Sequence, residues 1–223
     1  MNSEEIRQKI IEWGANLVGF GDLKNCIPGK FKYLKNGVSI AVRLSGSIMD
    51  EVINGPTKKY AAHYHLVNAL LTSIASKTTR LIKSFGYKAF PLPVAQTIDK
   101  NELKAIFPHK TAATRAGLGW IGKNALLVTP EFGPRVRLIT ILTDYPFELD
   151  LPIEKDQCNK CNKCVDICPL NALKGNSWQI GVKRYDLVDV LLCSKLIEEN
   201  KKILNAPVCG QCISVCPIGG KKS

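Results

Sequence analysis

The stretch Cys158-Asn-Lys-Cys161-Asn-Lys-Cys164-Val-Asp-Ile-Cys168-Pro169 decides how the last third of the chain folds. Its spacing, Cys-x2-Cys-x2-Cys-x3-Cys-Pro, is that of the bacterial ferredoxin run, in which three thiolates hold one 4Fe–4S cluster and the fourth reaches a second cluster. A second copy, Cys193-x15-Cys209-x2-Cys212-x3-Cys216-Pro217, follows with its first spacer stretched. An inserted helix or loop would account for that longer spacer.

Crossed ligation of this kind predicts which cysteines share a cluster. One 4Fe–4S cluster takes Cys158, Cys161, Cys164 and Cys216, and the other takes Cys193, Cys209, Cys212 and Cys168. The alternative is a pair of zinc knuckles, which would need two local sets of four ligands, usually with paired Cys-x2-Cys motifs. That alternative leaves the two copies of Cys-x2-Cys-x3-Cys-Pro unexplained. The remaining cysteine, Cys26, has no nearby partner, and we expect a small side chain in a loop.

Composition places the chain among globular proteins with a reduced, metal-binding set of cysteines. The 223 residues are 45% hydrophobic and 22% charged, and they carry nine cysteines and a formal charge of +12. No apolar run approaches the ~18 residues of a membrane span, and the acidic start at Met1–Glu5 is unlike a signal or transit peptide. We therefore expect a cytoplasmic protein without a membrane partner. The positive charge suits phosphate-bearing ligands, nucleic acid or an acidic redox partner, although no dense basic block with interleaved aromatics is present.

Hydrophobic periodicity divides the chain into an α/β part over residues 1–150 and a cysteine-rich module over residues 151–223. A helix with Ser3 as its cap is expected over residues 3–13, and a long helix is expected to open at Pro56 and end at Gly86. A short helix is expected over 111–116, and strands are expected at 16–20, 38–44, 87–92, 125–128 and 136–142. Arg135 and Arg137, at the start of the last strand, are expected to face water.

A glycine-rich stretch, Gly117-Leu-Gly119-Trp-Ile-Gly122, matches the dinucleotide-binding fingerprint letter by letter. That fingerprint requires a strand before the glycines and a helix after them, whereas here the predicted order is reversed, which argues against nicotinamide binding. The glycines permit close approach to another ligand, and Lys123 and Asn124 add hydrogen-bond donors. The alternative is structural: Gly117 ends the preceding helix and a tight turn follows.

Several of these residues resemble the epoxyqueuosine reductase family, which is related to reductive dehalogenases and cobalamin-processing proteins. The similarity lies in the runs 115–127, 129–133 and 141–144, in Leu17-Val-Gly-Phe20, and in the double-cluster module with its isolated Cys193. It covers essentially the whole chain. The resemblance implies an α+β protein with a nitroreductase-like α/β domain (1–150) followed by a ferredoxin-like domain with two 4Fe–4S clusters (151–223).

The resemblance also implies a cobalamin cofactor in the first domain, next to one cluster. Electrons from an external donor such as ferredoxin or flavodoxin would pass through the clusters to cobalt. The residues matched to this cofactor site are Arg115, Gly117, Gly119, Gly122, Lys123 and Asn124. Lys110 and Arg115 have a simpler alternative as exposed surface residues.

Two departures from the family argue against tRNA as a substrate. Family members that act on tRNA carry an Asp as proton donor in a Val-Asp-Thr-Gly-Pro-like segment, but the run 91–96 here has no acid. Asp99 and Glu102 follow without matching the motif, so His109 is the candidate catalytic group, with a solvated helix start as its alternative. The chain also ends seven residues after Cys216, without the helical repeats of the tRNA enzymes.

The sequence therefore predicts a cobalamin-dependent or cobalamin-reducing iron–sulfur reductase that does not act on tRNA. Two alternatives remain: an electron-transfer or corrinoid-reducing partner without its own substrate, and a tRNA-binding module in which the clusters are structural.

Overall fold

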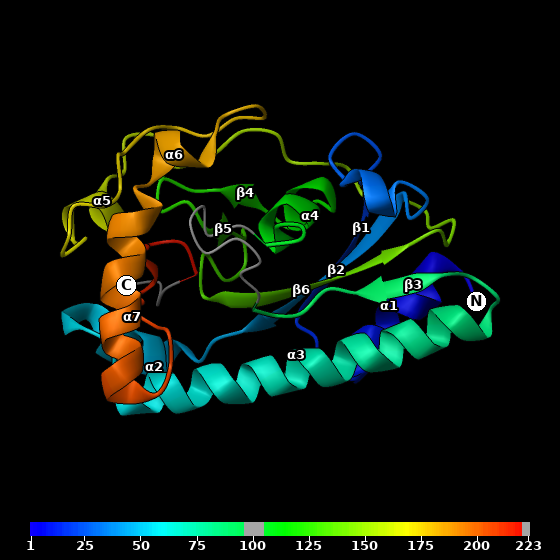
Figure 1. The fold of residues 1–223 in the computed structure, drawn as a ribbon, viewed down its shortest axis with the longest axis horizontal. Coiled ribbons are helices and arrows are strands. Elements are labelled where there is room, and N and C mark those ends of the chain that lie inside the picture. The colour runs from blue at the N-terminus through cyan, green and yellow to red at the C-terminus, as the bar shows by residue number, and fades with distance from the viewer. Residues whose placement is uncertain (96–104, 220–223) are drawn as a thin grey trace. The chain divides into compact units, whose positions relative to one another are not determined.

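A four-stranded sheet lies at the centre of the first compact part of the chain. The computed structural model describes residues 1–95 and 105–219. The strand order is β1 (Leu17–Asp22), β2 (Asn36–Arg43), β6 (Val136–Thr143) and β3 (Ala89–Pro91). β1 pairs antiparallel with β2, and β3 pairs antiparallel with β6. Together with the helices drawn in Figure 1, this sheet confirms the predicted α+β class.

The helices differ widely in length. The long ones are α1 (Ser3–Glu12), α3 (Lys58–Ser84) and α7 (Val190–Leu204). Short turns of helix are η1 (Gly29–Phe31), α2 (Gly46–Asp50), η2 (Glu51–Asn54), α4 (His109–Arg115), α5 (Lys163–Asp166), α6 (Arg184–Leu187) and α8 (Gln211–Ser214). A small hairpin pairs β4 (Trp120–Ile121) with β5 (Leu127–Val128). β5 is shorter than the expected strand because Ala125 adopts a positive φ of 56° and forms the turn instead.

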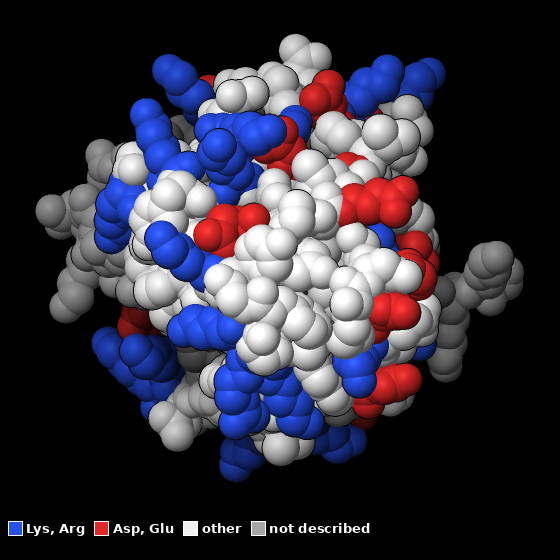
Figure 2. All heavy atoms as spheres, turned by 90° about the vertical axis from the view of Figure 1, so that its right-hand side faces the viewer, with Lys and Arg blue, Asp and Glu red and all other residues white. Residues whose placement is uncertain are grey.

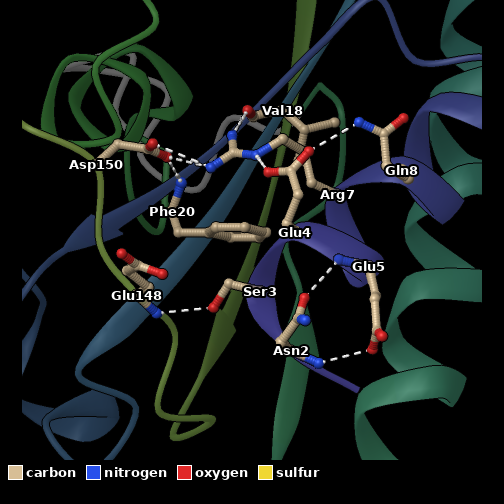
Figure 3. Close-up of polar contacts among 10 residues, drawn as sticks. All are labelled: Asn2, Ser3, Glu4, Glu5, Arg7, Gln8, Val18, Phe20, Glu148 and Asp150. Carbon is tan, nitrogen blue, oxygen red and sulfur yellow. Dashed lines mark hydrogen bonds and ion pairs between the residues drawn. The ribbon is translucent and has the colours of Figure 1, made fainter.

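The N-cap of the first helix lies one residue earlier than predicted. Asn2, not Ser3, is the N-cap: its side-chain oxygen accepts the Glu5 backbone N–H at 2.9 Å, and the Glu5 carboxylate accepts the Asn2 N–H at 2.9 Å. Ser3 lies inside the helix, and its hydroxyl accepts the backbone N–H of Glu148 at 2.8 Å (Figure 3). The predicted Ser3 cap is therefore wrong, because Asn2 makes the reciprocal capping pair and leaves Ser3 free for the distant contact.

Arg7 of α1 connects the helix to the sheet. Its Nη2 atom donates to both carboxylate oxygens of Asp150, at 3.0 and 3.2 Å, and its Nη1 atom donates to the Val18 carbonyl. Asp150 also accepts the backbone N–H of Phe20 at 2.7 Å (Figure 3). One carboxylate thus joins α1 and β1 to the segment that follows β6.

Two glycines in β1 allow α4 to lie directly on the strand. A Cβ atom at Gly19 would overlap the carbonyl oxygen of Ala116, and one at Gly21 would lie 2.8 Å from the carbonyl carbon of Arg115. Glycine inside a strand marks such a close backbone approach. This packing fixes the end of α4, from which the glycine-rich stretch begins.

The chain divides into two compact units that alternate along the sequence. One contains residues 1–42, 68–118 and 137–153, and the other contains 43–67, 119–136 and everything from Glu154 onward. The second unit holds all eight clustered cysteines and takes two segments from the part of the chain before residue 150. A domain boundary near residue 150 stays a prediction.

The surface carries mixed charge with an excess of basic side chains. Figure 2 shows one face on which Lys and Arg form several groups, with Asp and Glu gathered mainly along one side. Among the helices of the described residues, none is long and apolar enough to cross a membrane.

Candidate metal centre

The first set of thiols gathers around Cys164. Burial, together with the charges of Cys158, Cys216 and Cys161, raises the pKa of this thiol to about 12. Burial likewise raises the pKa of Cys216, with the charges of Cys158 and Cys161 adding to it. The structure therefore brings Cys216 of the second run to the three leading cysteines of the first.

The second set gathers around Cys212. Burial raises its pKa, and the charges of Cys209, Cys164, Cys193 and Cys168 act in the same direction. Burial also raises the pKa of Cys193, and the charges of Cys209 and Cys168 act in the same direction. The charge of Cys164, from the first set, also raises the pKa of Cys212, so the two sets are adjacent. These neighbours are the two sets of four that crossed ligation requires; cluster ligation by them stays a prediction.

The arrangement of the thiols bears on the zinc alternative. Among the residues that the structure describes, no three His, Cys, Asp or Glu side chains are placed to hold a single metal ion. A cubane of four irons and four sulfides separates its thiolates more widely than one tetrahedral ion does.

Local hydrogen bonds support the first cysteine run. The carboxylate of Asp156 accepts the backbone N–H of Cys158 at 2.9 Å and that of Trp178 at 2.6 Å. The sulfur of Cys168 accepts the backbone N–H of Ala172 at 3.3 Å. Donors of this kind, aimed at a ligand sulfur, tune the potential of an iron–sulfur cluster.

The stretched spacer of the second run, for which the sequence left a helix or a loop open, is a helix. Cys193 lies in the first turn of α7, which Asp189 caps by accepting the Leu192 N–H at 3.0 Å. Asn205 ends α7 in the left-handed conformation at φ 55°. The His65 Nε2 atom lies 2.9 Å from the Asn205 carbonyl oxygen and so fixes the return of the chain towards Cys209.

Arg135 does not face water, so that expectation is wrong. Its side chain is 5% exposed, and its Nη1 and Nη2 atoms donate to the Asp50 carboxylate at 2.8 Å and the Ser214 carbonyl at 2.7 Å. Arg137 also has a partner, because its Nε atom donates to the Asn68 side-chain oxygen at 3.0 Å. The position of Arg135 at the start of a strand gave no sign of these contacts, which come from distant parts of the sequence.

The glycine-rich stretch forms a helix end and a hairpin. Gly117 follows α4 with φ +69°, and β4 comes after it, so the predicted order of helix before strand is confirmed. A Cβ atom at Gly119 would overlap the Val128 carbonyl. At Gly122 it would lie 2.7 Å from the Val128 side chain and 3.5 Å from the sulfur of Cys158. These glycines let the hairpin close beside a cysteine of the first run.

The polar residues of this stretch already have protein partners. Lys123 is 7% exposed and donates to the Asn162 side-chain oxygen at 2.9 Å. Asn124 is 5% exposed, and its side-chain oxygen accepts the Leu126 N–H at 3.1 Å. Lys123 is thus joined to the first cysteine run, while Asn124 holds the hairpin turn.

Two further side chains complete the picture at this stretch. Arg115, half-buried, donates from Nε to the Asp22 carbonyl at 3.1 Å. The indole Nε1 of Trp120 is buried and has no hydrogen-bond partner among the residues that the structure describes. Trp120 belongs to the same dense group of special residues as Lys123 and Asn124, although it is not among the residues matched to the cofactor site.

His109, the candidate catalytic group, begins α4 with both ring nitrogens engaged. Nδ1 lies 2.9 Å from the Thr140 hydroxyl, and Nε2 lies 2.9 Å from the Pro93 carbonyl oxygen. Burial lowers its pKa and the Arg137 charge acts in the same direction, whereas the bond to Pro93 opposes them. Because the Pro93 carbonyl can only accept, Nε2 is the donor of that bond. These bonds fix the start of α4; a catalytic role stays a prediction. Asp99 and Glu102 lie outside the described residues.

The cysteine unit matches a known family of cluster-binding domains. Residues 157–219 match the family described as a 4Fe-4S double cluster binding domain. This part of the chain is therefore similar to domains that bind two 4Fe–4S clusters.

The curated relatives carry a more particular name. The chain is 38% identical over 143 residues to the epoxyqueuosine reductase of Bacillus anthracis, a match that covers 62% of this chain and 36% of the relative. It is 32% identical over 148 residues to that of Listeria monocytogenes, covering 61% of this chain and 35% of the relative. The chain thus spans about a third of the length of these relatives, and the predicted resemblance to epoxyqueuosine reductases is confirmed.

Solved structures agree in fold. A catabolic reductive dehalogenase, NpRdhA, matches with a TM-score of 0.75 at 23% identity, over 99% of this chain and 32% of that one. A selenomethionine-labelled epoxyqueuosine reductase matches with a TM-score of 0.67 at 21% identity, over 99% of this chain and 66% of that one. The fold class predicted from the sequence is confirmed by both.

Proposed function

We propose that this iron–sulfur protein is a reductase that passes single electrons through two 4Fe–4S clusters to a bound corrinoid. The observation that carries the proposal is the gathering of eight thiols into two facing sets of four, within a unit that matches a double-cluster domain. The corrinoid part is supported by similarity of fold to a structure described in terms of B12-dependent dehalogenation.

The chemistry of the donor set fits two such clusters. Cys158, Cys161, Cys164 and Cys216 would hold one, and Cys193, Cys209, Cys212 and Cys168 would hold the other. When bound, each cluster supplies a centre that takes up and releases one electron. The chain contributes thiols whose pKa values burial raises, so loading with iron must displace protons from Cys164 and Cys212.

The corrinoid would lie along Gly117–Asn124. Lys123 and Asn124 are turned to protein partners, and Arg115 donates to Asp22. The groups left to meet the corrinoid are therefore the glycine backbone and the Trp120 indole, whose N–H lacks a partner within 1–95 and 105–219. His109 would act as an acid only by giving up a bond that it makes to Pro93 or Thr140.

The first test is metal analysis after anaerobic reconstitution. We expect about eight iron and eight sulfide per chain in the wild type. Cys193→Ser should lose or convert one cluster, while the matched variant Cys26→Ala should keep the full iron content. Four irons in the wild type, or iron loss on changing Cys26, would contradict the ligand assignment.

The second test is a visible-spectrum titration with cob(II)alamin. A spectral change at micromolar protein is expected for a reductase that binds the corrinoid. No change would contradict the corrinoid half of the proposal and favour an electron-transfer partner that uses ferredoxin or flavodoxin as its donor.

A tRNA substrate is the remaining alternative. One similar structure is an epoxyqueuosine reductase with an epoxyqueuosine-modified tRNA stem loop. We nevertheless propose that this chain does not reduce epoxyqueuosine in tRNA, since loss of a positioned general acid typically costs about 10²–10⁴-fold in rate. Mass analysis of tRNA nucleosides after incubation with a strong reductant tests this. Queuosine formed at ordinary enzymatic rates would contradict it, and a steep salt dependence of tRNA binding would show phosphate contacts.

A further inference from the structure

A buried arginine touches the peptide that leads into the last ligand cysteine. Arg135 is 4% exposed, and its Nη2 atom donates to the Ser214 carbonyl at 2.7 Å, two residues before Cys216. The chain just before Arg135 also lies against the residues after that cysteine, because a Cβ atom at Gly133 would overlap the Ile218 carbonyl oxygen. The segment ending at Arg135 therefore holds the Cys216 loop on both sides of the sulfur.

The charge of this arginine is only partly compensated. Nη1 donates to the Asp50 carboxylate at 2.8 Å and lies 3.4 Å from the Gly46 carbonyl. The Asp50 side chain is 38% exposed, whereas that of Arg135 is 5% exposed. Solvent screens the carboxylate far more than the guanidinium, so a net positive potential remains beside the cysteine loop.

One hydrogen-bond donor of this guanidinium has no acceptor among the residues that the structure describes. The Nε atom is buried and has no partner. Buried donors are almost always bonded, and a charged one left unpaired is costly. An acceptor that the protein itself does not provide, such as an anionic cluster, would satisfy both this donor and the surplus charge.

We propose that Arg135 is a positioning and charge-compensating residue for the cluster that takes Cys216, and that it raises the reduction potential of that cluster alone. The inference rests on the proposed function, since it requires the crossed cluster set of Cys158, Cys161, Cys164 and Cys216. Reduction adds one negative charge in a poorly screened interior, and a fixed buried cation favours the more negative state.

The experiment is a redox titration of the reconstituted full-length protein with dithionite, followed by electron paramagnetic resonance. Arg135→Met should lower the midpoint potential of one cluster. At a fixed applied potential, the oxidised-to-reduced ratio of that cluster should rise by about tenfold, which corresponds to a shift of ~59 mV for one electron. The other cluster should not move. Arg135→Lys should restore most of the shift, because it keeps the charge.

A matched control removes an exposed charge of the same kind. Arg43 lies in the same compact unit, is exposed, and stacks over the Phe132 ring with its guanidinium carbon 5.3 Å from the centroid. Arg43→Met should leave both potentials in place. If Arg135→Met keeps its iron and both potentials stay unchanged, the proposal is wrong.

A second variant decides the matter if Arg135→Met fails to fold or to hold iron. Asp50→Asn removes the partly screened counter-charge and leaves the cation, so it should raise the potential of the same cluster. An unchanged or lowered potential in Asp50→Asn would overturn the proposal. A wild type that binds no cluster would instead contradict the proposed function, and the inference with it.

Discussion

The two cysteine runs share their spacing but are supported in different ways. The first run has a support close in sequence, Asp156, which accepts the N–H groups of Cys158 and Trp178, and one from further away, Lys123, which donates to Asn162. The second run packs on segments far away in the chain: α8 lies on α2 and η2, and a Cβ atom at Gly210 would come within 2.8 Å of Tyr60. The matched domain, residues 157–219, includes none of these distant supports.

This difference distinguishes two properties of a cysteine run: which thiols can share a cluster, and how stably the run is held in the fold. Spacing determines which thiols can share a cluster, because the reach of a few residues is local. The stability of the second run depends on Gly46–Tyr60 and on the segment 129–135, which belong to the same compact unit without being close in sequence. Variants that affect one kind of support and not the other should therefore behave differently.

The largest effect is expected on removing the second run. A chain ending at Asn205 lacks Cys209 and Cys212 of one set and Cys216 of the other, so it should hold no intact cluster. Metal-binding energy is folding energy in so small a module, and the cysteine unit should lose its fold as well. Iron analysis and circular dichroism under anaerobic conditions measure both. A well-folded truncated chain with one intact cubane would disprove crossed ligation.

The next effect concerns the distant support of the second run. Gly133→Ala should destabilise the protein by about 4 kcal/mol or more, because the new Cβ atom would overlap the Ile218 carbonyl and the backbone there has φ +56°. Gly175→Ala, beside the first run, is the matched control. Its φ is +75°, but the nearest atom, Cγ2 of Val165, is 3.8 Å away, so only backbone strain of about 1–2 kcal/mol is expected.

Urea unfolding of the reconstituted proteins compares the two glycine variants. Equal midpoints for Gly133→Ala and Gly175→Ala would show that the two runs are supported alike.

A smaller effect should distinguish two capping aspartates. Asp156→Ala removes the acceptor for two backbone N–H groups and should cost about 2 kcal/mol. Asp189→Ala removes a single helix cap, at the Leu192 N–H, and should cost about 1 kcal/mol. The same unfolding assay ranks them, and a larger loss for Asp189→Ala would reverse the expected order.

The smallest effect is a pH dependence confined to the support of the second run. The His63 Nε2 atom accepts the Ser45 N–H at 3.0 Å, just before α2, and burial lowers the pKa of His63 below its usual 6.5. The unfolded chain therefore takes up a proton first, so this stabilisation is present above about pH 6.5 and is lost as the pH falls below it.

Hydrogen exchange of the Ser45 amide, corrected for its intrinsic rate, measures the local loss between pH 7.5 and 6.0. The Trp178 amide, bonded to Asp156, is the internal reference near the first run. Protection at Ser45 that does not fall with pH would contradict the assignment to His63.

Local features of this protein were predictable from its sequence. The order of α4 before β4 and most strands follow from spacing and periodicity, which act over a few residues. The cap of α1 was misplaced by one residue because Asn2 and Ser3 are both good caps, and only the reciprocal bond with Glu5 chooses between them.

Contacts between distant segments were decided by the tertiary structure alone. Arg135 at a strand start looked like a solvated residue, yet Asp50 and Ser214 meet it in the interior. Lys123 and Asn124 looked like ligand donors, yet the fold turns them to Asn162 and the Leu126 N–H. A sequence pattern records what a residue can donate or accept, whereas burial and the choice of partner depend on which remote segments the whole chain brings beside it.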